Sequence, residues 1–96
     1  MSEFEVMQKA IKTYGDDSQI DKAIEEMSEL TKALLKLRHC TKDYERQVLM
    51  DAVDEEMADV EIMMCQLGMI FKNQYRMAMC YKKKIERLER RLRNGE

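Results

Sequence analysis

Apolar residues recur every three or four positions along most of the chain, which predicts amphipathic helices rather than strands. The first apolar stripe predicts a helix from Glu3 to Tyr14, and Gly15 is a natural end for it. The second predicted helix runs from about Gln19 to Leu37, with Asp17 or Ser18 as its N-terminal cap. The stripes of these two helices contain Phe4, Met7, Ile11 and Tyr14, and then Ile20, Ala23, Ile24, Met27, Leu30, Leu34 and Leu37.

Two more helices are expected in the second half of the chain. The pattern predicts one from about Tyr44 to Phe71, in which Gly68 either introduces a kink or permits close helix contact. Residues 72–74 are the expected break before the last helix. The last apolar stripe is typical of a bundle or coiled-coil seam and consists of Tyr75, Ala78, Tyr81, Ile85, Leu88 and Leu92.

Composition agrees with a single all-α domain over residues 1–96, arranged as a four-helix bundle. The chain has no proline and three glycines, and helix-favouring Glu, Lys, Met, Leu and Ala are abundant. Because so short a chain buries only a modest core, we expect it to form an oligomer. No apolar run is long enough to span a bilayer, so no membrane partner is expected. The odd cysteine number and the absence of a CxxC pair favour free thiols and a cytoplasmic location.

The net charge of −2 conceals an asymmetry along the chain. Residues 1–61 carry sixteen acidic and eight basic side chains, a balance of −8, whereas residues 62–96 carry three and nine, a balance of +6. An acidic body with a basic tail suits a metal ion together with an anionic ligand such as a phosphate. The alternative is that the basic residues form an ordinary solvated helix face.

The most informative feature is a pair of carboxylate motifs on the two central helices. Glu26 and Glu29 are three residues apart on the second helix, and Glu56 and Asp59 are three apart on the third. Residues at this spacing share a helix face, and each pair borders an apolar stripe. The carboxylates are therefore expected to point toward the bundle, where like charges repel strongly unless a cation is bound.

Chain lengths place the two pairs at similar heights in an antiparallel hairpin. About nine residues separate Glu29 from the loop, and about eleven lead back to Glu56, roughly 14 and 17 Å at the helical rise. Four facing carboxylates form the hard oxygen site that Mg²⁺ prefers, with Mn²⁺ as a possible substitute. A solvated face is the alternative for either pair alone. A di-iron carboxylate site is disfavoured because the single histidine, His39, follows neither motif.

These motifs resemble a known family. The segment Glu25-Glu26-x-x-Glu29, followed after a loop by Glu56-x-x-Asp59, is similar to the EExxE…ExxD motif of MazG-like all-α NTP pyrophosphohydrolases. The similarity covers about residues 18–70 and includes the flanking apolar residues. It implies an oligomeric bundle, a homodimer or homotetramer, that cleaves an NTP or dNTP to the monophosphate and pyrophosphate.

The resemblance also implies roles for individual residues. Glu26, Glu29, Glu56 and Asp59 would bind Mg²⁺, and the basic residues Lys83, Lys84 and Arg87 match the family's later phosphate-binding segment only loosely. Glu25 and Glu55 are spare acids beside the ligands, and either is a candidate general base, with a solvent-facing role as the alternative. Met27, Met57, Met63 and Met64 lie on the apolar stripes, so we expect them to pack in the core, with one or two near a base pocket.

A protein of a different class is also compatible with the sequence. The basic last helix would suit a non-catalytic helical interaction module that pairs with a partner helix. Binding to nucleic acid is not expected, because the chain has no recognisable DNA-reading motif or stacking platform. The two functions differ in a simple way, since the interaction module would need neither Mg²⁺ nor the four acids.

Overall fold

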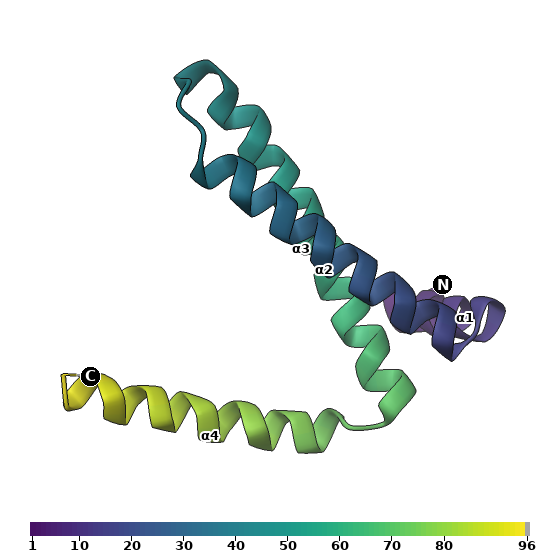
Figure 1. Cartoon of the computed structure of the whole chain (residues 1–96). Helices are drawn as coiled ribbons and strands as arrows, with labels where there is room; N and C mark the ends of the chain where they lie inside the picture. Colours follow the sequence, from purple (N-terminus) through teal and green to yellow (C-terminus); the bar gives the residue numbers. More distant parts are fainter. Residues whose placement is uncertain (96) are drawn as a thin grey trace.

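Residues 1–95 form four helices joined by short connections. The computed structural model describes residues 1–95 (Figure 1) and consists of α1 (Glu3–Tyr14), α2 (Asp16–Arg38), α3 (Asp43–Phe71) and α4 (Gln74–Arg93). No strand occurs in this part of the chain. The prediction of an all-helical fold with four helices is therefore confirmed, and the predicted bounds of α1 are those observed.

The junction between α1 and α2 differs from the prediction. Gly15 alone separates the two helices, and α2 begins at Asp16, before either of the predicted capping residues. Gly15 adopts a φ of 92°, a left-handed conformation that costs glycine little, and it occupies the N-cap position without a side-chain hydrogen bond. Asp16 and Asp17 instead lie in the first turn, where their charges favour the positive end of the helix dipole.

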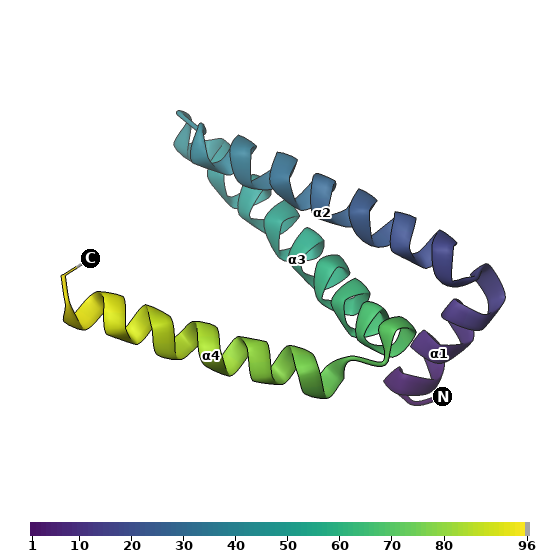
Figure 2. The ribbon, with the colours of Figure 1, turned by 60° about the horizontal axis from the view of Figure 1, so that its bottom comes forward.

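An antiparallel hairpin of α2 and α3 forms the body of the molecule (Figures 1 and 2). Its buried apolar residues are few and mostly small, which allows the two backbones to approach closely. They are Ala23, Ala33, Val53 and Met63. The helix α1 packs against both α2 and α3 at the end of the hairpin where the N-terminus lies.

The last helix lies apart from the other three. Lys72 adopts a left-handed conformation with φ 51° at the C-cap of α3, and the chain then turns into α4. Figures 1 and 2 both show α4 projecting away from the hairpin, and none of its residues is buried. Along its predicted seam, Tyr81, Ile85, Leu88 and Leu92 are between 49% and 69% exposed. Within one chain the seam does not fold back onto the hairpin.

Exposed apolar side chains are also found on the hairpin itself. Ile24, Leu34, Met57 and Met64 are each between 45% and 58% exposed, although they lie on helices that pack against each other. Among the helices of residues 1–95, none combines the length and the apolar run that crossing a bilayer requires. The three cysteines, Cys40, Cys65 and Cys80, are free.

Candidate metal centre

The hairpin brings together carboxylates from both of its helices. Glu26 is on α2, Glu56 and Asp59 are on α3, and one oxygen of each lies within 4.8 Å of the others. Glu26 is only 8% exposed, because it lies on the side of α2 that faces α3. The antiparallel packing thus places three of the four predicted ligands in one group, which we call the acidic cluster.

Glu56 is the least satisfied member of the acidic cluster. Its Oε2 is buried and has no hydrogen-bond partner. Burial raises the pKa of the Glu56 carboxyl, and the neighbouring negative charges of Glu26, Asp59, Glu29 and Glu55 raise it further. A buried oxygen without a donor, surrounded by like charges, is an arrangement that a bound cation would stabilise.

A cation from the chain itself already contacts this cluster. Lys22 Nζ lies 3.0 Å from Glu26 Oε1, one helical turn away on α2. Its hydrogen bond to Glu26 raises the pKa of Lys22, with further contributions from the charges of Glu25, Glu26 and Asp59. Lys22 was not among the site residues predicted from the sequence, although its position four residues before Glu26 is typical of an ion pair on a helix.

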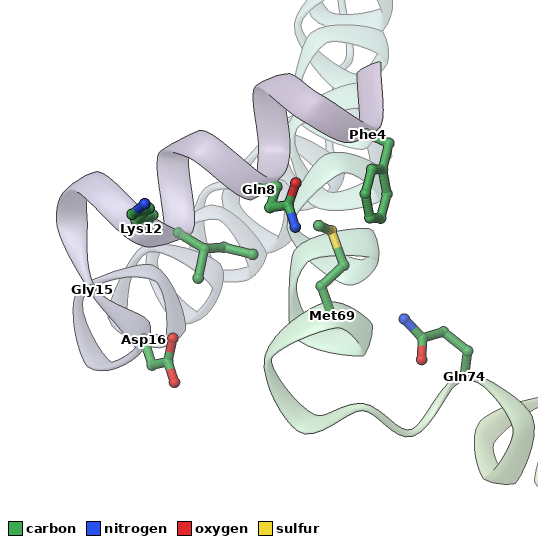
Figure 3. A pocket seen from close by; sticks show the side chains of 8 residues that line it. Phe4, Gln8, Lys12, Gly15, Asp16, Met69 and Gln74 are labelled. Carbon is green, nitrogen blue, oxygen red and sulfur yellow. The ribbon is translucent and has the colours of Figure 1, made fainter. Parts of the chain in front are cut away.

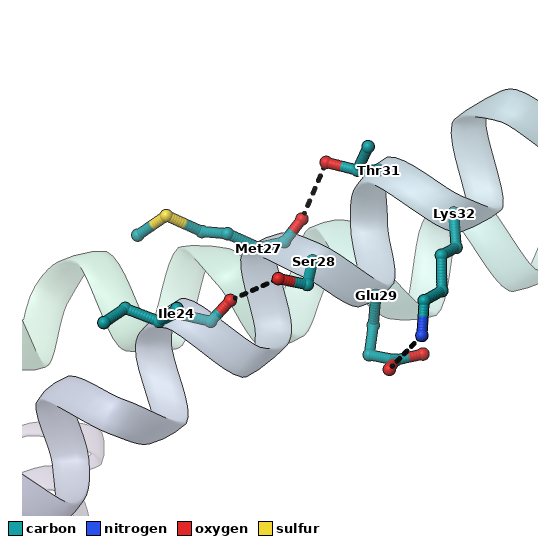
Figure 4. A network of polar contacts seen from close by, with 6 residues as sticks. All are labelled: Ile24, Met27, Ser28, Glu29, Thr31 and Lys32. Atoms are coloured by element: carbon teal, nitrogen blue, oxygen red, sulfur yellow. Dashed lines mark hydrogen bonds and ion pairs between the residues drawn. The ribbon is translucent and has the colours of Figure 1, made fainter.

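The fourth predicted ligand is oriented differently. Figure 4 shows Glu29 paired with Lys32, whose Nζ lies 3.4 Å from Glu29 Oε1. Glu29 is therefore not among the oxygens that lie within 4.8 Å of one another, although it is close enough for its charge to raise the pKa of Glu56. On another side of this part of α2, the hydroxyls of Ser28 and Thr31 donate to the carbonyls of Ile24 and Met27, each at 3.0 Å.

The other predicted site residues fall into two groups. Glu25 and Glu55 are exposed and next to the cluster, since their charges raise the pKa values of Lys22 and Glu56 respectively. Lys83, Lys84 and Arg87 are exposed on α4, which does not pack against the hairpin. Within a single chain these three basic residues are not brought to the acidic cluster.

The donor atoms of the cluster fit Mg²⁺. All three are carboxylate oxygens, which hard divalent cations prefer, and Glu56 Oε2 is available as a ligand because no hydrogen bond occupies it. His39 is at the C-cap of α2, next to the loop and away from the cluster, so the histidine that a di-iron site normally uses does not belong to this group.

A separate cleft of about 510 Å³ lies at the junction of α1, α3 and α4. Figure 3 shows Phe4 and Gln8 of α1 around it, with Met69 of α3 and Gln74 of α4. Met69 follows Asp59 by about three helical turns, roughly 15 Å, so this cleft is distinct from the acidic cluster. No protein-family profile, curated protein or solved structure matches the chain.

Proposed function

We propose that the chain is a Mg²⁺-dependent nucleoside triphosphate pyrophosphohydrolase of the MazG-like kind. The observation that supports this proposal is the cluster of Glu26, Glu56 and Asp59, with its unpartnered Glu56 Oε2. A group of carboxylates this close is electrostatically unfavourable alone and suits a divalent cation. The reaction itself, which releases a monophosphate and pyrophosphate, comes from the resemblance of the two acidic motifs to that family.

In this proposal Glu26, Glu56 and Asp59 bind Mg²⁺. Glu29 becomes the fourth ligand once its ion pair with Lys32 is broken. When bound, the ion supplies charge neutralisation at the phosphates, and Mn²⁺ is expected to replace it. Glu25 and Glu55 are adjacent and exposed, so either can accept the proton of the attacking water.

Lys22 has a role in the same proposal. Its ammonium group lies 3.0 Å from the Glu26 carboxylate. Because a divalent cation would compete for that carboxylate, metal binding would release Lys22 toward the phosphates of the substrate. A lysine there would offset the negative charge that develops on phosphoryl oxygens.

The functional unit in this proposal is a homodimer or a homotetramer. The helix α3 carries eight acidic and one basic side chains, a net charge of −7, while α4 carries two acidic and eight basic ones, a net charge of +6. Since α4 presents an unburied apolar seam, it would pack on the hairpin of a second copy. That arrangement would also bring Lys83, Lys84 and Arg87 near acidic residues of the other copy.

A panel of canonical and modified NTPs and dNTPs, incubated with Mg²⁺, tests the reaction. The expected products are the nucleoside monophosphate and pyrophosphate, separated by ion-exchange chromatography. Release of orthophosphate and a diphosphate would contradict the proposed bond cleavage, and absence of any Mg²⁺-dependent turnover would contradict the enzyme itself.

The second candidate is a non-catalytic interaction module. The exposed seam of α4 favours it, because a 20-residue helix without packing partners in its own chain is marginal in water. Under this alternative, Mg²⁺ has no effect on any activity and the acidic cluster is dispensable for partner binding. The nucleotide panel and the substitutions described in the Discussion separate the two candidates.

A further inference from the structure

A second open cleft adjoins the acidic cluster near the start of α2. Its volume is about 550 Å³, within the range of roughly 300–1,000 Å³ that small-molecule sites occupy. The end of α1 contributes Tyr14, α3 contributes Met63, and α2 contributes Gln19, Asp21, Lys22 and Glu25. Lys22 lines this cleft and forms an ion pair with Glu26 of the acidic cluster, so the cleft and the cluster are adjacent.

We propose that this cleft binds the base and sugar of the nucleotide whose phosphates lie at the acidic cluster. The inference rests on the proposed function and adds to it the part of the site that recognises the nucleoside. It assigns binding roles to Tyr14 and Gln19, which belong neither to the two acidic motifs nor to the acidic cluster.

The side chains of the cleft suit a nucleobase. Tyr14 is 65% exposed, so its ring is free to stack on a planar base, and such stacking is tolerant of base identity. Met63 is 5% exposed and provides an apolar surface in the same cleft. Gln19 is 8% exposed and lines the same cleft, and its amide offers a donor beside an acceptor to a base edge.

The order of residues along α2 fits the order of groups in a nucleotide. Gln19 precedes Lys22 by three residues, and Lys22 precedes Glu26 by four, so all three lie along one side of the helix. Gln19 and Glu26 are thus two turns apart, roughly 10 Å along the axis. A base contact, a phosphate contact and a metal ligand therefore follow one another along α2.

Charge determines which end of the nucleotide enters the cleft. The carboxylate of Asp21 is exposed there and would repel phosphates. The same carboxylate can accept hydrogen bonds from sugar hydroxyls, since an ionised carboxylate is an acceptor only. The neutral nucleoside end is consequently the part of the ligand that this cleft favours.

The test uses the full chain with Mg²⁺ and the nucleotide that the panel identifies as the best substrate. Tyr14→Ala is expected to raise KM roughly tenfold, the effect of losing one stacking contact, with a smaller change in kcat. Tyr14→Phe should keep the wild-type KM, because it retains the aromatic ring. Tyr44→Ala is the matched control, since Tyr44 is a similarly exposed tyrosine at the opposite end of the hairpin. Gln19→Glu should change the ranking of bases in the panel, because it removes the amide donors.

The outcomes separate this inference from the proposed function. If the wild-type protein hydrolyses nucleotides and Tyr14→Ala and Gln19→Glu behave like it, the cleft does not bind the nucleoside and the enzyme assignment stands. If no nucleotide is hydrolysed, the proposed function fails, and titration with nucleoside 5′-monophosphates followed by backbone amide NMR tests the cleft directly. Shifts at Tyr14 and Gln19 would then support nucleotide binding without catalysis, and their absence would overturn the inference.

Discussion

The α2–α3 hairpin and the helix α4 are both long, amphipathic and rich in charge, yet only the hairpin finds packing partners within the chain. On the hairpin, small residues such as Ala23, which is 1% exposed, lie where the two helices face each other. On α4 every described residue is exposed, and its apolar seam has no facing helix in the same chain. An apolar stripe predicts that a helix will be covered, but the facing stripe must be present for packing to occur.

The two regions also hold their charges differently. The hairpin gathers acids against each other, so that Glu56 Oε2 is buried without a hydrogen bond. The basic residues of α4 are spread over an exposed helix, where repulsion is weakened by water and salt. The crowding of carboxylates in the hairpin therefore supports the proposed metal site, whereas the spread charge of α4 supports no ligand by itself.

The largest effect is expected from changing the metal ligands of the hairpin. Glu56→Gln and Asp59→Asn should each reduce Mg²⁺-dependent nucleotide hydrolysis about 100-fold or more, because each removes a charged ligand from the cluster. Glu26→Gln and Glu29→Gln should also reduce Mg²⁺-dependent nucleotide hydrolysis. Steady-state kinetics with circular dichroism as the folding check would measure this.

The matched control for these ligands is Asp54→Asn, which changes an exposed acid of α3 outside the acidic cluster. It should retain wild-type kinetics. Full activity in any two of the four ligand variants would refute the metal-site assignment.

The next largest effect is expected on α4. Leu88→Asp should raise the dissociation constant of the homo-oligomer tenfold or more, because burying a leucine contributes about 1.5–3 kcal/mol to association. Arg90→Ala alters net charge equally on the opposite side of α4 and should change assembly less. Light scattering over a concentration series measures the difference. A wild-type chain that is monomeric at tens of micromolar and still active would exclude the oligomer while leaving the metal site intact.

Core substitutions compare the packing of the two regions directly. Ala23→Leu places three extra carbons between α2 and α3 and should reduce the free energy of unfolding by about 1–3 kcal/mol. Ala78 on α4 has open surroundings within one chain, so at a concentration where the chain is monomeric Ala78→Leu should change the free energy of unfolding by less than about 0.5 kcal/mol. Urea denaturation measures both. Equal destabilisation by the two variants would mean that α4 is packed as tightly as the hairpin.

The smallest effect concerns the pH dependence of the metal-free hairpin. Because the pKa of Glu56 is raised on folding, its contribution to stability is fully present below the pKa of the unfolded glutamate, about 4.3, and is lost as pH rises through the folded value. Glu56→Gln should therefore melt at a higher temperature than the wild type at pH 7 with EDTA. The two melting temperatures should converge near pH 4. If the variant melted at a lower temperature than the wild type at pH 7, the charged Glu56 carboxylate would not destabilise the protein in the absence of metal.

The sequence by itself determined the helices and the heights of the acidic pairs. Helical periodicity is a local property, so the bounds of α1 and the existence of four helices could be predicted from apolar spacing alone. The constant rise of a helix also placed Glu26 level with Glu56 and Asp59 once the hairpin was assumed. The start of α2 was missed because glycine at the N-cap carries no side-chain signal.

Only the tertiary structure decided which ion pairs the acidic side chains form and which helices pack against each other. Glu29 pairs with Lys32 and Glu26 with Lys22, and both lysines lie within one turn of their partners, so spacing alone does not say which carboxylate joins the cluster. The apolar periodicity of α4 likewise did not predict that this helix lies apart from the hairpin. An amphipathic helix has the same apolar stripe whether its partner is in the same chain or in another, because periodicity records that a face is to be covered and not by what.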